Sequence, residues 1–269
     1  MTRLRAVLAG AVVVLALSLG CAGKPLPRRP PPVPMSRSEI EAIVEALERQ
    51  AESVRRYQGL VRVRGRGPEG SFDARLVVVF ERPDRMRVEL LGAFGATRWS
   101  AVADEAQIVA YFPGRKQYVQ ESDVEAVVAL LLGIELDTRD VMAILSGVGI
   151  AFDPATLVSG EREGASVVLR FDGGRDLVVD DQGQVVEARA SGYRARYESR
   201  WKNAGRYFPD AVVLENDRVR ARIGTEEVDV NVPLAEDVFV LEMAEGATRL
   251  RPAEVDGEAV FVVTREPPL

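Results

Sequence analysis

Residues 72–90 read FDARLVVVFERPDRMRVEL, and this stretch predicts the fold of the chain. Apolar side chains occupy every second position from Phe72 to Phe80, and again from Met86 to Leu90. Because successive side chains of a β-strand point to opposite faces, both runs are typical of strands with one apolar face. The Pro83-Asp84 pair between them indicates a turn. The stretch therefore predicts an antiparallel hairpin with one buried face.

The same alternation recurs on both sides of this hairpin. Val61 and Val63 alternate with arginines before it, and further apolar alternations follow it, separated by clusters of glycine, asparagine and aspartate. Such clusters at hairpin spacing favour an antiparallel meander. We therefore expect a mainly β fold of about ten to eleven antiparallel strands. Outside residues 61–63 and 72–90, the expected strands cover residues 97–103, 107–112, 116–120, 167–171, 176–179, 185–190, 195–199, 211–215, 219–223 and 228–232.

Three segments change from strand to helical spacing. Ser36 and Glu39 form a Ser-x-x-Glu capping box before a helical apolar pattern, which predicts a helix from Ser36 to about Tyr57. Two shorter helices are expected near the middle of the chain, one over residues 122–132 and one between residues 137 and 147. A sheet with one apolar face must curl and cover that face, and these helices are the available cover.

The first twenty residues are typical of a secretory signal peptide. Arg3 and Arg5 precede an apolar run, Ala6 to Leu19, which is shorter than the ~20 residues that cross a bilayer. The run ends at Gly20-Cys21 and resembles the bacterial lipobox, in which the cysteine is acylated and becomes the new N-terminus. An uncleaved membrane anchor, or an ordinary signal peptide followed by a chance cysteine, is the alternative interpretation.

Cys21 is the single cysteine of the chain, which supports lipidation, because a free thiol is a liability in an oxidising compartment. Ala22 stands where an aspartate would resemble an inner-membrane retention signal, and this favours the periplasmic face of the outer membrane. Six prolines between residues 25 and 34 exclude a helix or strand in this stretch and predict an extended tether. We therefore divide the chain into a signal peptide (1–20), a lipidated cysteine with its tether (21–35), a folded domain (36–245) and a polar C-terminal tail (246–269).

The composition argues against several classes of function. The chain has no histidine, which removes the commonest general base and most zinc sites. No phosphate-binding loop, dinucleotide fingerprint or nucleophile elbow occurs where a strand would meet a helix. The net charge of −6 argues against a nucleic-acid partner. We therefore expect that the protein is not an enzyme and has no cofactor or metal site. The alternative, which we disfavour, is a hydrolase that uses two carboxylates, such as Asp180-Asp181 or Glu226-Glu227.

Four segments, in this order, are similar to the LolA/LolB family of lipoprotein-localisation proteins. They are residues 57–63, the hairpin at 80–90, its continuation at 91–97 and the helical region at 127–147. The resemblance implies an open half-barrel in which the N-terminal helix and the inserted helical pair cover the concave face. It also implies a cavity that binds the acyl chains of lipoproteins or other lipids. The lipidated Cys21 favours the LolB-like branch, whose members receive lipoproteins at the outer membrane.

The resemblance further implies which residues meet the acyl chains. Burial of hydrocarbon contributes ~25 cal/mol per Å², so capture of a chain needs no catalytic group. The same side chains would also form an ordinary solid β core, which is the alternative. The expected cavity residues are Val61, Val63, Phe72, Leu76, Val78, Phe80, Met86, Val88, Leu90 and Trp99, and the expected lid residues are Val127, Val128, Leu131, Val141 and Leu145.

Phe94 lies between Gly92 and Gly95 at a hairpin tip, where polar residues are usual. In LolB-like proteins the matching hairpin carries an exposed apolar residue, usually leucine, that contacts the membrane during cargo insertion. The resemblance implies this role for Phe94. The alternative is that its ring folds back onto the sheet.

We therefore expect a monomer whose partners are acyl chains, a soluble periplasmic carrier, and the membrane through the acyl groups on Cys21. The alternative function is an envelope sensor or assembly lipoprotein that uses the same fold to bind a protein partner.

Overall fold

The computed structural model describes residues 31–68, 70–203 and 206–255. The signal peptide, Cys21, most of the tether and the last fourteen residues lie outside this range, so the structure does not bear on the predictions made for them. Residues from Pro32 onward belong to one compact unit, which is described below. Within the described residues, no helix is long and apolar enough to cross a membrane.

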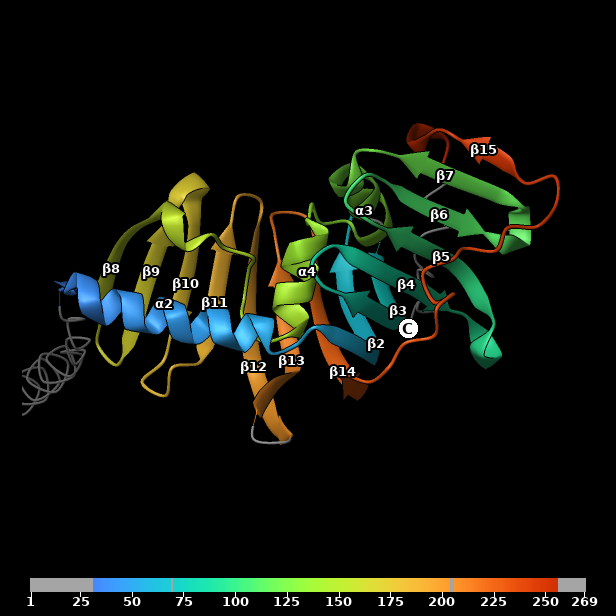
Figure 1. Cartoon of the computed structure of the whole chain (residues 1–269). Helices are drawn as coiled ribbons and strands as arrows, with labels where there is room; N and C mark the ends of the chain where they lie inside the picture. Colours follow the sequence, from blue (N-terminus) through green and yellow to red (C-terminus); the bar gives the residue numbers. More distant parts are fainter. Residues whose placement is uncertain (1–30, 69, 204–205, 256–269) are drawn as a thin grey trace, which may run out of the picture. The chain divides into compact units, whose positions relative to one another are not determined.

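The unit is built on a single open sheet (Figure 1). Its strands lie in the order β1-β8-β9-β10-β11-β12-β13-β14-β2-β3-β4-β5-β6-β7-β15, and every neighbouring pair is antiparallel except β7 and β15. The strands are β1 (Val33–Pro34), β2 (Arg56–Gly67), β3 (Gly70–Glu81), β4 (Arg85–Leu91), β5 (Thr97–Ala103), β6 (Ile108–Phe112), β7 (Gln117–Glu121), β8 (Leu157–Glu163), β9 (Ser166–Phe171), β10 (Arg175–Val179), β11 (Val185–Ala190), β12 (Tyr193–Asn203), β13 (Arg206–Glu215), β14 (Arg220–Val230) and β15 (Thr248–Leu250).

The pairing of β14 with β2 joins two meanders that are far apart in the sequence. Ile223 lies opposite Val63, and the pairing extends from Arg220 opposite Arg66 to Val230 opposite Tyr57. A register shift between Thr225 and Glu227 marks a bulge in β14. A bulge bends its strand and increases the local twist. The two strands expected at 219–223 and 228–232 are therefore one continuous strand with a bend at the bulge.

The described sheet contains 15 strands, more than the ten to eleven predicted. Three of the described strands, β1, β8 and β15, match no predicted segment, because they lack a clear alternation. In β8 the pattern is interrupted at Gly160, where an added Cβ would lie 2.6 Å from Cγ1 of Ile40, so the close approach of the N-terminal helix requires glycine. The prediction that the tether could form no strand was wrong at Val33–Pro34, because a short edge strand does not need the missing N–H of proline.

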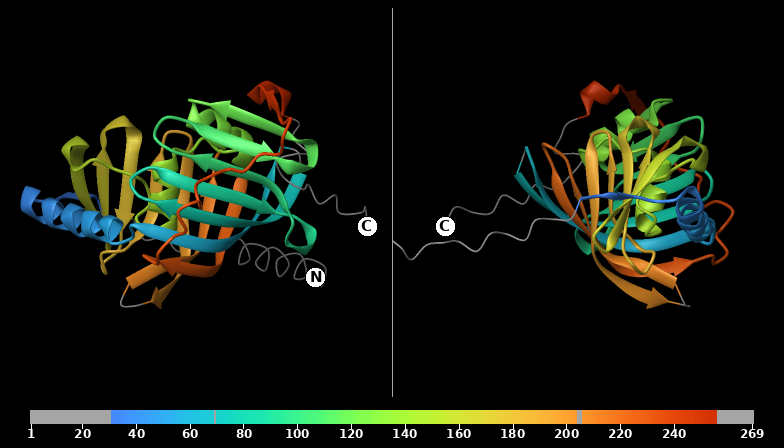
Figure 2. Two further views of the ribbon diagram at one scale, coloured as in Figure 1. Left: turned by 45° about the vertical axis from the view of Figure 1, so that its right-hand side comes forward. Right: turned by 90° about the vertical axis from the view of Figure 1, so that its left-hand side faces the viewer.

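Three α-helices lie on one face of the sheet: α2 (Arg37–Glu52), α3 (Val124–Leu132) and α4 (Thr138–Leu145). In Figure 1, α2 crosses strands β8–β11, and the right-hand view of Figure 2 shows α2 and α4 on the same side of the sheet. The inward side chains of the strands and the apolar faces of the helices form one buried core. This is the expected half-barrel with a helical cover.

The capping box at the start of α2 is present as predicted. The Glu39 carboxylate accepts a hydrogen bond from the Ser36 backbone N–H at 3.0 Å, and the Ser36 hydroxyl accepts one from the Glu39 N–H at 3.4 Å. The predicted end of the helix was wrong, because α2 ends at Glu52 and Tyr57 lies in β2. The Asn231 side chain explains the early end: its oxygen accepts from the N–H groups of Arg55 and Arg56, and its nitrogen donates to the Ser53 carbonyl.

After β14 the chain crosses the outer face of the sheet, and we call residues 232–247 the strap. The Arg87 guanidinium donates to the carbonyls of Val238 and Val240 at 3.0 Å, and the Ala244 N–H donates to the Tyr111 hydroxyl at 3.1 Å. The strap leads into β15, inside the segment expected as a polar tail, and β15 covers part of the outer edge of β7. Covered edges are protected from pairing with other chains.

The role of Asn231 in ending α2 can be tested by mutation. Its φ is 57°, so Asn231→Ala removes three hydrogen bonds and also places alanine in the left-handed region. We expect a loss of about 2 kcal/mol in the free energy of unfolding, measured with urea. Asn231→Gly keeps the backbone conformation and should lose only about 1 kcal/mol. Equal effects of the two substitutions would contradict a cost of alanine in the left-handed region, and a stability of Asn231→Gly equal to that of the wild-type chain would contradict a role for the side-chain hydrogen bonds.

Candidate functional site

A small cavity lies between the concave face of the sheet and α4. Its volume is about 70 Å³, and all of its lining side chains are aliphatic or aromatic. Cavities without polar partners for water stay dry and admit apolar ligands. The lining residues are Val61, Val63, Phe72, Leu76, Val78, Val88, Ile134, Leu136, Val141, Ile144, Leu145, Leu214, Ala221 and Ile223.

A second void of about 30 Å³ lies beside the first, under α3 and α4. Val88 and Val141 line both voids, so a single side-chain layer separates them. The second lining is also wholly apolar and consists of Met86, Val88, Trp99, Ala101, Ala103, Ile108, Val128 and Val141. The two voids together are therefore an apolar space that the helices almost fill.

The structure places eight of the ten expected cavity residues around these voids. Val61, Val63, Phe72, Leu76, Val78 and Val88 line the first, and Met86, Val88 and Trp99 line the second. Phe80 and Leu90 are buried but line neither. The Phe80 ring stacks on Tyr57 with a centroid separation of 5.0 Å and an interplanar angle of 3°, so Tyr57 fills the space over Phe80.

The expected lid residues divide between the two voids. Val141 and Leu145 of α4 line the first void, and Val128 of α3 lines the second together with Val141. Val127 is fully buried but lines neither void, and the side chain of Leu131 lies outside the described part. Ile134, Leu136 and Ile144 of the lid also line the first void and were not predicted. Leu214, Ala221 and Ile223 were not predicted either, although they lie in predicted strands and could have been found from their alternation.

The helix α4 is held to the sheet by a buried carboxylate. Asp140 is 2% exposed, forms an ion pair with Arg175 of β10, and accepts hydrogen bonds from the Tyr193 hydroxyl at 2.7 Å and the Ala151 N–H at 2.9 Å. Burial, with the charge of Asp140 as a smaller cause, holds the pKa of Tyr193 far above its usual value. Tyr193 therefore stays a hydrogen-bond donor at neutral pH.

A second set of hydrogen bonds holds the other end of α4. The Tyr197 hydroxyl donates to the Ile144 carbonyl at 2.9 Å and accepts from the Gly149 N–H at 3.1 Å. Burial also raises the pKa of Tyr197 well above its usual value. Arg82 donates to the Ser146 hydroxyl at 3.3 Å and to the Val54 carbonyl at 3.0 Å. Both ends of α4 are thus fixed by buried polar contacts.

The helix α3 is held differently. Its N-terminus is capped by Asp123, whose carboxylate accepts from the Ala126 N–H at 3.0 Å. Among the residues that the structure describes, no side chain of α3 forms a hydrogen bond or ion pair with the sheet; the buried contacts of α3 are those of Val127 and Val128. Gly133 ends the helix in the left-handed conformation with φ 74°. Within the described side chains, apolar packing alone therefore holds α3 over its void.

Phe94 stands at the tip of the β4–β5 hairpin and is fully exposed, with a relative accessibility of 107%. The tip is tight: the Gly92 N–H donates to the Ala96 carbonyl at 2.7 Å, and the Gly95 N–H donates to the Gly92 carbonyl at 3.2 Å. Phe94 has φ 61° and ψ 20°, a left-handed conformation that bulky residues rarely adopt. The ring does not fold back onto the sheet.

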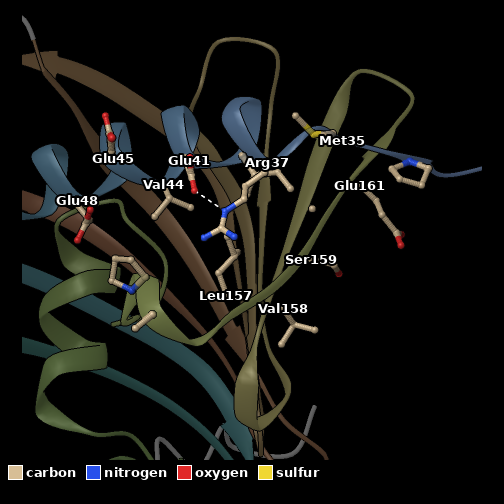
Figure 3. A pocket seen from close by; sticks show the side chains of 15 residues that line it. Met35, Arg37, Glu41, Val44, Glu45, Glu48, Leu157, Val158, Ser159 and Glu161 are labelled. Atoms are coloured by element: carbon tan, nitrogen blue, oxygen red, sulfur yellow. Dashed lines mark hydrogen bonds and ion pairs between the residues drawn. The ribbon is translucent and has the colours of Figure 1, made fainter.

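A larger groove of about 760 Å³ lies elsewhere, between α2 and β8 (Figure 3). Ile40, Val44 and Leu157 give it apolar walls, but Arg37 and Glu41 form an ion pair of 2.7 Å beside them. This groove was not predicted, because β8 was not recognised as a strand. Its mixed lining suits a polar partner better than a hydrocarbon chain.

The two modes of attachment in the lid can be tested by mutation. Asp140→Ala leaves Arg175 and Tyr193 without their buried partner, and we expect a loss of about 3 kcal/mol in the free energy of unfolding. Asp123→Ala removes one helix cap from α3 and should cost about 1 kcal/mol. Urea denaturation measures both. A loss for Asp140→Ala no larger than that for Asp123→Ala would contradict the tight attachment of α4.

Comparison with known proteins supports the description of the fold. The chain matches no known protein-family profile, and no curated protein matches it in sequence. Among solved structures, a LolA superfamily protein from Nitrosomonas europaea is similar with a TM-score of 0.50 and 14% identity, covering 73% of this chain and 97% of that one. A putative outer membrane lipoprotein-sorting protein domain from Vibrio parahaemolyticus gives a TM-score of 0.53 and 9% identity, covering 74% and 95%.

A DUF1329 family protein from Desulfovibrio piger is also similar, with a TM-score of 0.52 and 10% identity over 74% of this chain and 96% of that one. At such low identities the likeness concerns the fold alone. The chain has the LolA-like fold, a mainly β half-barrel with a helical lid, as the sequence resemblance implied.

Proposed function

We propose that this chain is a lipoprotein of the outer membrane that receives lipoproteins, or other lipids, and inserts them into the membrane. The wholly apolar cavity under the helical lid carries this proposal. It occurs in a fold shared with a lipoprotein-sorting domain, and hydrocarbon is the ligand class that such a lining suits. In this proposal the chain is a carrier rather than an enzyme, because transfer of a lipid requires no covalent step.

The size of the cavity indicates how cargo would be accepted. About 70 Å³ is well below the ~300–1,000 Å³ of ordinary ligand pockets, so the described conformation is a closed one. An acyl chain must displace part of the lid. The contacts favour α3 as the part that moves, because α4 is fixed at both ends by buried polar contacts and α3 is not.

The free energy lost when α3 leaves its place over the void would be offset by the free energy gained when the cargo binds there. Opening exposes apolar side chains such as Val127 and Val128, and an arriving chain covers apolar surface in their place. Each buried CH₂ group contributes ~0.8 kcal/mol, so the exchange of one apolar cover for another can be close to neutral. A carrier that must both accept and release its cargo needs such a balance.

The anchor and the hairpin tip would complete the carrier. Acyl groups on Cys21 would hold the domain beside the membrane, with the residues between Cys21 and strand β1 as the tether. Phe94 would contact the same membrane when cargo is delivered. Its full exposure supports this role, because an isolated aromatic ring at a strained tip contributes nothing to the core.

A second candidate function is the binding of an extended protein segment. In the described chain, β1 pairs with β8 only at Glu161 and Arg162, so the outer edge of Leu157–Ser159 borders the groove without a strand partner. Strand addition at such an edge is a common mode of peptide recognition. This observation favours a sensor or assembly role as the alternative.

Filling the cavity should abolish lipid binding. Ala221→Leu places extra carbons in the first void, and we expect the acyl chains that co-purify with the protein, measured by mass spectrometry, to fall at least about tenfold. Ala188→Leu is the matched control, because Ala188 is also fully buried but lines neither void. A wild-type chain with no co-purifying acyl chains beyond those attached to Cys21 would overturn the proposal and favour the groove as the functional site.

Changing the hairpin tip should separate binding from delivery. Phe94→Glu is expected to leave acyl binding unchanged but to abolish transfer of a bound lipoprotein to vesicles, because a charged tip cannot enter the apolar layer. Phe94→Leu keeps an apolar tip and should retain transfer. Undiminished transfer by Phe94→Glu would exclude Phe94 as the membrane contact.

A further inference from the structure

Phe94 does not stand alone at its end of the sheet. Strands β4 and β6 run in the same direction, so the turns that follow them, at residues 92–96 and 113–116, project from one end (right-hand side of Figure 1). The strand register places the two turns at the same level. Leu90, near the end of β4, pairs with Trp99 of β5, and the next residue of β5, Ser100, pairs with Tyr111, near the end of β6. We call this end of the sheet the tip face.

The two turns and the residues beside them carry positive charge. Arg98, Arg115 and Lys116 are exposed, and residues 92–98 and 113–117 include no carboxylate. Within the described ranges, neither Arg98 nor Lys116 forms an ion pair. A Cβ built on Gly92 would lie 2.9 Å from Cγ of Arg98, so the arginine stem lies against the base of the hairpin that presents Phe94.

The opposite end of the same strands is more acidic, although Arg82 and Arg85 lie at the turn between β3 and β4. The turn between β5 and β6 contains Asp104 and Glu105, and Asp123 follows β7; all three are exposed. The Glu89 carboxylate accepts a hydrogen bond from the Thr97 hydroxyl at 3.4 Å, but it also forms an ion pair with Arg87. Two exposed carboxylates of the strap, Glu242 and Glu245, flank Ala244, whose N–H donates to the Tyr111 hydroxyl near the tip face. Positive charge is thus concentrated around Phe94, in a chain whose net charge is −6.

We infer that the tip face binds anionic phospholipid, with Arg98, Arg115 and Lys116 contacting phosphate groups while Phe94 enters the apolar layer. Cations close to an anionic leaflet are attracted to it, and an aromatic ring among them adds apolar burial. The segregation of charge along β4–β7 also orients the domain with Phe94 towards the membrane before contact. This inference rests on the proposed function and adds the class of lipid that would be recognised.

The experiment measures binding of the full chain to lipid vesicles by co-sedimentation. Cys21→Ser removes the acyl site from every variant, so that differences between variants report the folded domain. Vesicles of phosphatidylcholine alone are compared with vesicles that also contain phosphatidylglycerol. We expect stronger binding to the anionic vesicles, and we expect this preference to disappear at about 1 M salt, where the Debye length is only ~3 Å.

Charge substitutions should change the affinity in opposite directions. Arg98→Ala with Lys116→Ala is expected to weaken binding to anionic vesicles by about fivefold for each cation removed. Glu245→Gln, which removes a negative charge beside the tip face, should strengthen it. Arg55→Ala with Arg196→Ala is the matched control, because both arginines are exposed, lie outside the tip face and have no ion pair within the described part. The control should change binding less than twofold.

Three results would overturn the inference: equal binding to both kinds of vesicle, no binding of the Cys21→Ser chain without further substitution to either, or equal losses in the control and the tip-face variants. A failure of this inference can be told apart from a failure of the proposed function. If Arg98→Ala with Lys116→Ala leaves vesicle binding unchanged while Phe94→Glu still blocks lipoprotein transfer, the proposed function stands and the preference for anionic lipid fails.

Discussion

The pairing of β14 with β2 is the contact on which the rest of the structure depends. It joins the meander β2–β7 to the meander β8–β14 and so makes one sheet from two halves of the chain. The first void lies across this junction, because Val61 and Val63 come from β2 while Ala221 and Ile223 come from β14. Contacts between segments so distant in sequence carry the entropic cost of closing a long loop. The cavity therefore exists only when both halves have folded and paired.

The two helices of the lid, α3 and α4, are attached to the sheet by two different kinds of contact. The buried polar contacts of Asp140, Tyr193 and Tyr197 are directional, and breaking one leaves an unpaired group in the core. Apolar packing, which holds α3, is not directional and can be exchanged for packing against another hydrocarbon. One helix thus maintains the shape of the site while the other can give way to a ligand of the same chemical nature as the core.

The proposed membrane contact follows from exposure and strain together. A phenylalanine in the left-handed region is unfavourable both for the backbone and for its hydration, and nothing in the fold of the domain gains from it. The neighbouring Arg98 and Lys116 lie where an inserted ring would bring the domain against lipid headgroups. The groove beside α2 lies over a different part of the sheet, on β8, so a site for a protein segment would not compete directly with the tip face.

Much of the fold could be predicted from the sequence, because periodicity is local. The alternation in residues 72–90 determined β3 and β4, and Ser36 with Glu39 determined where α2 begins. Local pattern failed where distant residues act: Asn231 ends α2 early, and β8 shows no alternation because Ile40 packs on Gly160. The exposure of Phe94 could be proposed from its flanking glycines. The alternative, that its ring folds back onto the sheet, could be rejected only from the tertiary structure.

The sequence by itself determined which residues face inward; only the tertiary structure decided which of them border empty space. Leu76 and Phe80 lie on the same face of β3, yet Leu76 lines the cavity and Phe80 does not. The physical reason is that Tyr57, brought opposite Phe80 by the pairing of β2 with β3, stacks on its ring and fills the space there. A void is a property of how neighbouring elements fill volume, and no single strand encodes it.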